Sequence, residues 1–313
     1  MDYLLVSLLN GVIYGLLLFM VSAGLTLIFG MMGVLNFAHA SFYMLGAYFA
    51  YALQGVLGFW GALIAAPILV GLVGVVVERF FLRRVHQHGH AHELLLTFGL
   101  SFIIAELIKV FFGNFPVDYR IPASLDFALF RLGDANYPVY RILMGSVAIV
   151  MFILMYLLLT RTRVGIVVRS AIYKPRMAEA LGHNVPLVFM GVFGVGAALA
   201  GLAGAVAGAF YTTNPNMALE LGVMVFVVVV VGGLGSMGGA MLASLLIGVI
   251  TSLSVGVDYS LADVLGLFGA RDWAEDVGGL LTLKVSSVSA TIPFALMLLV
   301  LMVRPSGLMG EKN

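Results

Sequence analysis

The residues of this 313-residue sequence that could do chemistry gather first in one polar segment, Arg161–Gly182. Pro175 suits the first turn of a helix, and Gly182 suits the left-handed position that follows a helix end. The pattern predicts a small helix over Met177–Leu181, lying across the ends of two apolar stretches. The charged residues of the segment are Arg161, Arg163, Arg169, Lys174, Arg176 and Glu179. Such a segment can recognise a protein partner, or it can be an ordinary basic helix at a membrane interface.

A second group of polar residues follows a glycine-containing break in an apolar run. Residues 27–43 read LIFGMMGVLNFAHASFY, and residues 228–244 repeat the order of apolar run, glycine break and small-residue helix. Paired breaks of this kind point to a solute site in the middle of a membrane, because unwound backbone is tolerated where it lines a cavity. The predicted pathway residues are Asn36, His39, Ser41, Tyr43, Gly232, Gly233 and Ser236. Alternatively, both breaks are turns between helices, with Asn36 as an N-cap.

Two further polar groups have simpler explanations. Glu106 lies in an apolar stretch with Lys109 three residues later, which predicts an ion pair at the membrane surface rather than a buried charge relay. Four histidines alternate in the run HQHGHAH over residues 86–92, but we find no cysteine or carboxylate beside them at a ligand spacing. For this loop we predict exposure to solvent and no metal.

Motifs for catalysis are absent from the sequence. It has no GxxxxGK(S/T) phosphate-binding loop, no HExxH zinc motif and no GxSxG nucleophile motif. It also has no cysteine, which excludes disulfides and thiol chemistry. We therefore expect that this chain is not an enzyme and holds no cofactor and no metal of its own.

The composition is that of an integral membrane protein. Hydrophobic residues make up 62% of the chain and charged residues 10%, with a mean hydropathy of +1.11, whereas soluble domains are about 45–50% apolar and about 25% charged. A net charge of +1 gives no reason to expect nucleic acid as a partner. Apolar segments lie at Tyr3–Phe29, Phe37–Leu53, Phe59–Val77, Leu94–Phe112, Val139–Leu159, Val185–Phe210, Leu219–Val231, Ala240–Val255 and Thr291–Val303. We predict one all-α transmembrane bundle over residues 1–313 with eight or nine spans, in which the short segments Phe37–Leu53 and Leu219–Val231 are half-helices or re-entrant.

Lysine and arginine near the ends of spans predict the orientation, because cytoplasmic loops are enriched in them. The loop Glu78–Glu93, the segment Arg161–Asn184 and the tail after Val303 are basic. The loops Gly113–Pro138 and Val257–Ser289 are acidic or balanced. The basic set is therefore expected inside and the acidic set outside. Nine spans place the N-terminus outside, and eight place it inside if one short segment re-enters.

Small residues recur every four positions in the apolar segment Val185–Phe210. Two such rows are Gly196, Ala200, Gly204 and Gly208, and Ala197, Gly201, Ala205 and Ala209. Residues four apart share a helix face, and small residues let helices approach closely in lipid. The rows predict tight packing of this helix, as Gly11 and Gly15 do for the first apolar segment.

Three stretches together resemble the permease subunits of branched-chain amino acid ABC importers. They are GLTLIFGMMGVLNFAHASFYMLGAY at Gly24–Tyr48, RMAEALGHN at Arg176–Asn184, and Phe210–Gly248, which runs from FYTTNP to VVGGLGSMGGAMLASLLIG; the C-terminal MVRPSGLMG also fits. The resemblance covers nearly the whole chain. It implies a multi-pass permease that moves a branched-chain or hydrophobic amino acid, or a related small solute, across a bacterial inner membrane. The family's solutes also include urea, short amides and aromatic acids.

The same resemblance implies a role for the basic segment. Residues 174–184 resemble the cytoplasmic coupling helix that inserts into a groove of an ATP-binding subunit. The positions carried over are Arg176, Ala178, Glu179, Ala180, Leu181 and Gly182. Family members work with a second permease (a copy or a paralogue), two cytoplasmic ATPases and a periplasmic solute-binding protein, so ATP and Mg²⁺ are expected on the ATPases. The alternative is an autonomous transporter or channel for a small neutral solute such as urea, whose ion relay would have to rest on Glu106.

Overall fold

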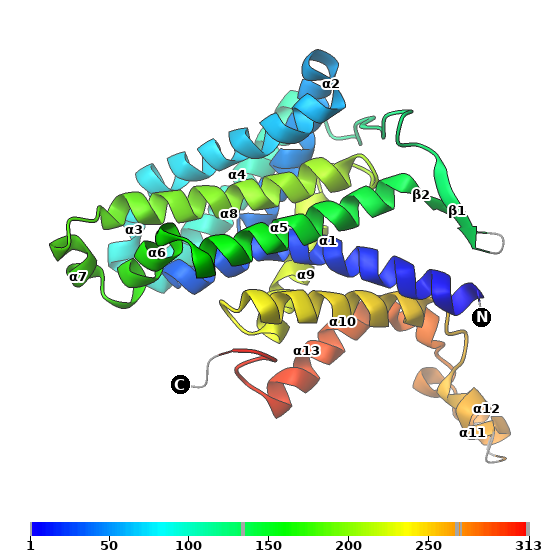
Figure 1. Ribbon diagram of the computed structural model, residues 1–313. Coiled ribbons are helices and arrows are strands. Elements are labelled where there is room, and N and C mark those ends of the chain that lie inside the picture. The colour runs from blue at the N-terminus through cyan, green and yellow to red at the C-terminus, as the bar shows by residue number, and fades with distance from the viewer. Residues whose placement is uncertain (1, 133–134, 267–268, 270, 311–313) are drawn as a thin grey trace.

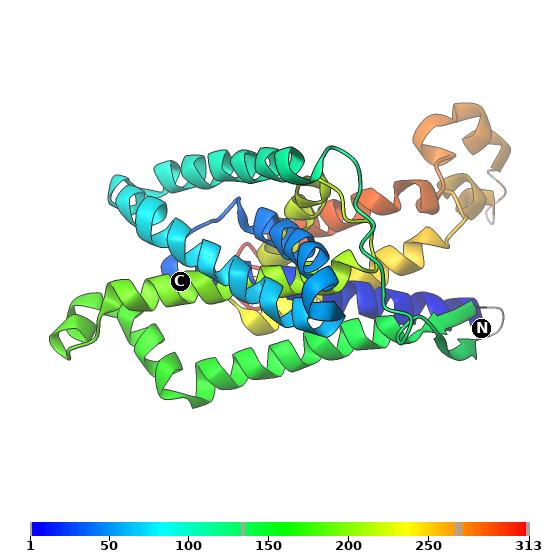
Figure 2. The same ribbon diagram turned by 90° about the horizontal axis from the view of Figure 1, so that it is seen from above.

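The computed structural model describes residues 2–132, 135–266, 269 and 271–310. Most helices run along one common direction, so that the molecule is an elongated bundle (Figures 1 and 2). The helices are α1 (Asp2–Met32), α2 (His39–Val77), α3 (Arg83–Val85), α4 (His90–Phe112), α5 (Val139–Arg161), α6 (Arg163–Tyr173), α7 (Pro175–Ala180), α8 (Val185–Gly208), α9 (Met217–Gly232), α10 (Met237–Val255), α11 (Leu261–Gly266), α12 (Arg271–Val277) and α13 (Ile292–Val303). A π-helical turn covers Glu78–Leu82, and 3₁₀ turns cover His86–His88, Gly279–Leu281 and Val285–Thr291. Strands β1 (Ala128–Leu132) and β2 (Ala135–Pro138) form one antiparallel hairpin.

The helices are long and apolar enough to make this a multi-pass membrane protein. Within the described residues, seven qualify as membrane spans: Leu4–Met32, His39–Val85, His90–Phe112, Val139–Arg161, Val185–Gly208, Met237–Val255 and Val285–Val303. Helix α9 is apolar but has only 16 residues. The predicted all-α transmembrane bundle is therefore confirmed, and the β1–β2 hairpin is an addition that the sequence patterns did not indicate.

Two of the predicted segments, Phe37–Leu53 and Phe59–Val77, lie in the single element α2. A break at Gly58, where φ is +69°, separates them. A Cβ built on Gly46 would meet Gly201 of α8, and a Cβ built on Gly201 would meet Val70, so both halves of α2 pack on the same part of α8. The chain therefore folds back at Gly58, as a helical hairpin.

The first half of α2 begins inside the bundle rather than at its end. Although α1 continues to Met32, the imidazole of His39 contacts the backbone oxygen of Val21, eleven residues before the end of α1. Residues 33–36 are non-helical and return the chain to that depth. The segment Phe37–Leu53 is thus a half-helix, one of the two arrangements expected for it.

The two ends of the bundle carry different charges. One end holds α3, α6, α7 and the C-terminal tail, and the other holds the N-terminus, β1–β2, α11 and α12 (Figure 1). All three basic regions are at the first end, and both acidic loops are at the second. This arrangement agrees with the predicted orientation, so we call the basic end inner and the acidic end outer.

Small residues bring the central helices into contact, as their spacing predicted. A Cβ on Gly204 of α8 would overlap the carbonyl group of Tyr43 in α2. Gly11 of α1 lies against Gly248 of α10, where a Cβ would meet the neighbouring backbone at 2.7 and 3.0 Å. Because burial in water does not drive helix association in lipid, this close backbone contact is the main source of packing energy.

Candidate functional site

The basic segment at the inner end forms two short helices, α6 and α7. Thr162 caps α6 by accepting a hydrogen bond from the Gly165 amide at 3.3 Å, and Pro175 stands in the first turn of α7. Gly182 has φ of +87° and donates its amide to the Glu179 carbonyl at 2.9 Å, while the His183 amide donates to the Ala178 carbonyl at 3.0 Å. These two bonds are a Schellman motif, which confirms the predicted left-handed end of the helix. The helix itself spans Pro175–Ala180, two residues earlier at its start than predicted.

The coupling residues divide between a buried side and an exposed side. Ala178 is buried against Ala171 and Val185. Met177 and Leu181 are 58% and 73% exposed, so they lie on the other side of this segment from Ala178. Arg176, Glu179, Ala180 and Gly182 are also exposed. This part of α7 therefore presents two apolar side chains with charges beside them at the inner tip of the molecule, which is a surface suited to a protein groove.

A charged contact joins α8, just after this segment, to the inner end of α2. Asn184 caps α8 by accepting the Leu187 amide at 3.1 Å. Arg83 donates to the carboxylate of Glu78 at 2.9 and 3.2 Å and to the Pro186 carbonyl at 2.8 Å. The Glu78 side chain is 3% exposed, so the guanidinium neutralises a carboxylate that is almost removed from solvent.

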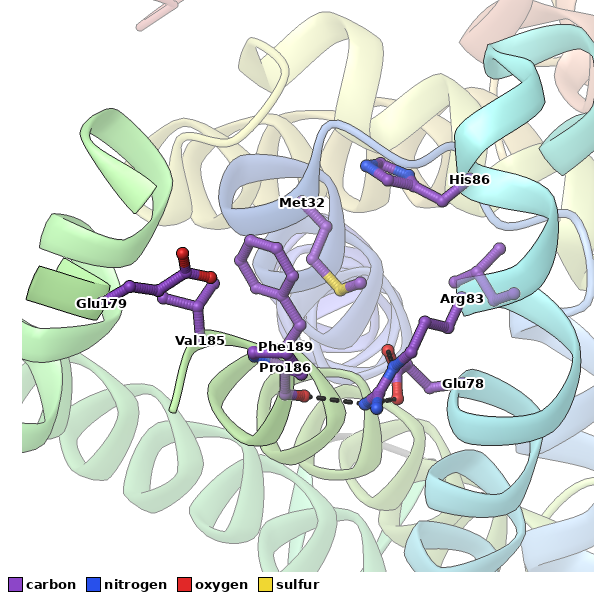
Figure 3. Close-up of a pocket in the computed structure, with 9 residues that line it drawn as sticks. Met32, Glu78, Arg83, His86, Glu179, Val185, Pro186 and Phe189 are labelled. Atoms are coloured by element: carbon purple, nitrogen blue, oxygen red, sulfur yellow. Dashed lines mark hydrogen bonds and ion pairs between the residues drawn. The ribbon is translucent and has the colours of Figure 1, made fainter. Parts of the chain in front are cut away.

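A cavity of about 280 Å³ separates α7 from this contact. Figure 3 shows Glu179 on one wall and the pair Arg83–Glu78 with His86 on the opposite wall, while Met32 and Phe189 lie between them. Ala178 of α7 packs in a buried cluster with Ala171 and Val185, whereas Glu179 faces the cavity. The π-helical turn that carries Glu78 is a rare local geometry, and such turns are frequent at functional sites.

The four histidines of the run are exposed, as predicted, but two of them also contact a buried carboxylate. Glu93 is 2% exposed, and its carboxylate contacts Nδ1 of His86 and, at 3.2 Å, Nδ1 of His90. His88 and His92 lie with their rings 5.7 Å apart and are exposed. His86 and His90 therefore help to fix the start of α4, because the buried carboxylate of Glu93 requires hydrogen-bond partners.

The first glycine break holds two buried polar side chains. Asn36 is fully buried, and its Oδ1 accepts the Ala38 amide at 3.0 Å. Asn36 therefore closes a turn just before the helix. The N-cap residue of α2 is Ala38 and not Asn36. The imidazole Nε2 of His39 lies 2.8 Å from the Val21 carbonyl. Asn36 Nδ2 and His39 Nδ1 are both buried and have no hydrogen-bond partner among the residues that the structure describes, so this polar pair is an energetic cost within the core.

The two breaks meet, but the predicted pathway residues do not surround one cavity. Gly30 and Gly235 touch, since a Cβ on Gly30 would lie 2.9 Å from the Gly235 Cα. Ser41 borders a groove of about 420 Å³ between α2, α4 and α9. Tyr43 borders an outer cavity of about 250 Å³. Ser236 caps α10 and borders an inner cavity of about 640 Å³.

Two of the predicted pathway glycines, Gly232 and Gly233, serve close packing at the inner end. Gly233 has φ of +101°, and a Cβ there would lie 2.7 Å from the Gly310 Cα in the C-terminal tail. The tail is fixed by the Leu308 amide, which donates to the Val231 carbonyl at 2.8 Å, and the Met309 amide, which donates to the Gly232 carbonyl at 3.0 Å. The motif RPSGLMG thus has a structural role, because it packs over the end of α9 and is hydrogen-bonded to it.

The ion pair predicted for α4 is present. Lys109 Nζ lies 2.6 Å from Glu106 Oε1, and the two side chains are 32% and 65% exposed. Sequence reasoning missed the buried acids Glu78 and Glu93, although both stand at the end of an apolar stretch, where an ionisable residue signals a partner. It also missed Glu220, in the first turn of α9.

Comparisons with known proteins give a consistent result. The family model described as "Branched-chain amino acid transport system / permease component" matches residues 7–301. The high-affinity branched-chain amino acid transport system permease protein LivH of Salmonella typhimurium is 28% identical over 324 residues, covering 99% of this chain and 96% of that protein. The corresponding protein BraD of Pseudomonas aeruginosa is 28% identical, with 97% and 95% covered. Among solved structures, PsaBC from Streptococcus pneumoniae in complex with Fab matches with a TM-score of 0.45 and 14% identity, over 95% of this chain and 91% of that one.

Proposed function

The chain belongs to the branched-chain amino acid transport system permease family, and we propose that it moves a branched-chain or similar hydrophobic amino acid through the inner membrane of a bacterium. The carrying observation is the match of the family model to residues 7–301 together with relatives that cover nearly the whole chain. The chain is a membrane permease and not an enzyme. The energy for import must therefore come from other subunits of the transporter.

That energy comes, in this proposal, from two cytoplasmic ATPase subunits that bind ATP and Mg²⁺. Each would receive an α7 in a groove, with Met177 and Leu181 as the apolar anchors and Arg176 and Glu179 beside them. The support is their exposure at the inner tip, together with the rigid Schellman end at Gly182. A second permease and a periplasmic binding protein complete the complex.

Movement of α7 passes to the bundle through the start of α8. Ala178 packs on Val185, and the next residue, Pro186, accepts a hydrogen bond from Arg83. Arg83 in turn pairs with Glu78 at the inner end of α2. A shift of α7 therefore acts on α8 and on the second half of α2, which pack closely along their length.

Alternating access is supported by the positions of two cavities. Tyr43 borders the outer cavity and Ser236 the inner one, and the packed residues Asn36 and His39 lie in the core that separates them. In this proposal the solute passes from the first cavity to the second when the core opens. Ser41 stays a predicted pathway residue on the groove side, whereas Gly232 and Gly233 act through packing of the tail.

Reconstitution tests the proposal. Proteoliposomes that contain this permease, its partner permease and the ATPases should accumulate radiolabelled L-leucine when binding protein is outside and ATP is inside. Liposomes that contain the permeases without ATPases should not. Accumulation that needs no ATPase would favour the autonomous transporter or channel instead. That alternative has no support from Glu106, whose carboxylate is paired with Lys109 and 65% exposed.

A further inference from the structure

The outer cavity is lined by more polar side chains than its position among apolar helices requires. It lies between α1, α2, α9 and the segment that follows α8. Its polar wall consists of Tyr14, Tyr43, Tyr211, Thr212 and Glu220, and its apolar wall of Leu17, Met217 and Leu221. A concave site in which polar groups converge beside apolar side chains can fix the orientation of a small molecule.

This cavity lies beside the outer half of α1. Tyr14 stands twelve residues after Asp2, which places it about 18 Å along α1 from its outer end. Helix α9 has 16 residues and is about 24 Å long, shorter than the hydrocarbon core of about 30 Å. Glu220, in the first turn of α9, is exposed and borders the cavity.

The polar groups of the cavity are not satisfied by one another. Tyr43 is 1% exposed, and its hydroxyl is the part that remains accessible, at the wall of the cavity. In the part of the chain that the structure describes, Glu220 forms no ion pair, and the hydroxyls of Tyr14, Tyr43 and Tyr211 form no hydrogen bond. These groups are placed to meet a ligand.

The chemistry of the wall selects one kind of group. A carboxylate forms its strongest hydrogen bonds with a cation, and the faces of tyrosine rings also attract cations. A primary ammonium suits both, while Leu17, Met217 and Leu221 can contact an aliphatic side chain. Urea, neutral amides and carboxylic acids without an amine would leave Glu220 unpaired.

We propose that the outer cavity is a solute site for a small molecule with a primary ammonium and an aliphatic side chain, in which Glu220 binds the ammonium. This inference rests on the proposed transport function and narrows its solute to amino acids and aliphatic amines. Tyr14, Tyr43 and Tyr211 surround the ammonium, and the site receives the solute before the core opens toward the inner cavity.

The test uses a single cysteine, since the chain has none of its own. Thr212→Cys in the assembled complex in nanodiscs is labelled with a maleimide, and the rate of labelling of the permease band is followed by gel. L-Leucine and isopentylamine should slow labelling at least fivefold at saturation, and 4-methylpentanoate, which lacks the amine, should not. Glu220→Gln should abolish protection by L-leucine, Glu220→Asp should retain part of it, and Glu106→Gln should leave it unchanged.

The outcomes separate this inference from the proposed function. Equal protection by L-leucine and 4-methylpentanoate, or full protection in the Glu220→Gln variant, would overturn the ammonium site even if the complex imports L-leucine. Absence of any protection by L-leucine would overturn it as well. Labelling needs no ATP hydrolysis, so ammonium-selective protection in a complex that fails to transport would instead count against the proposed function.

Discussion

Substitution of Gly182 isolates the backbone geometry of the coupling segment from all other effects. The residue has φ of +87°, and among the described residues other than its two chain neighbours none has an atom within 4 Å of the position that a Cβ would occupy. A side chain there meets no steric obstacle, so its cost arises only from the left-handed conformation, about 1–2 kcal/mol for an ordinary L-residue. If the ATPase requires the capped form, Gly182→Val should weaken its docking by about 5-fold to 30-fold, the equivalent of this free energy.

The assay is titration of the ATPase subunit onto the permease in nanodiscs, with ATP hydrolysed per solute imported as a second readout. Gly182→Asn should stay close to wild type, because asparagine tolerates the left-handed region. Gly191→Ala is the matched control: it lies on α8 near the same end, also with open space around it. Unchanged docking of Gly182→Val, or an equal loss for Gly182→Asn and Gly182→Val, would refute the reasoning.

Three further predictions follow from other contacts. Arg83→Gln leaves Glu78 buried without its partner and removes the hydrogen bond to Pro186, so more ATP should be hydrolysed per solute moved. Arg83→Lys should restore only part of the coupling, because lysine lacks the planar guanidinium fork. If Arg83→Gln couples ATP hydrolysis to transport as well as wild type, this contact does not transmit the movement of α7. Gly204→Leu would overlap Tyr43 and should lower the yield of folded protein by at least the 1–3 kcal/mol that overpacking usually costs, which is about 5-fold to 150-fold in the apparent folding equilibrium relative to Gly191→Ala. Equal yields would contradict the packing argument. In intact cells, an impermeant maleimide should label Tyr259→Cys and not Ser170→Cys, and the reverse pattern would invert the orientation.

Much of the fold follows from patterns of one residue type. Apolar runs located the spans, lysine and arginine located the inner end, and four-residue rows of glycine and alanine located the face of α8 that packs on α2. Each of these patterns reflects a local preference or a single contact surface. The fold-back of α2 at Gly58 could be anticipated only as a short segment, since its geometry depends on the fit of Gly46 and Val70 to the same stretch of α8.

The site was harder to predict because its parts are distant in the sequence. Pro175 and Gly182 could be assigned from local rules of helix ends, and both are confirmed. The link from Arg83 to Pro186 spans 103 positions and has no local signature. The role of Gly233 was also hidden, because the tail that covers it is more than seventy residues away in the sequence.

The docking of α7 on an ATPase is tested most directly by cysteine protection at its two exposed apolar residues. Met177→Cys and Leu181→Cys, each alone in this cysteine-free chain, should react readily in the free permease, where these positions are 58% and 73% exposed. In the assembled complex both should be protected, while Tyr259→Cys at the outer end should react equally with and without ATPase. If residues 177 and 181 react at the same rate in the free permease and in a complex that retains its ATPases, α7 is not the surface through which ATP hydrolysis drives this permease.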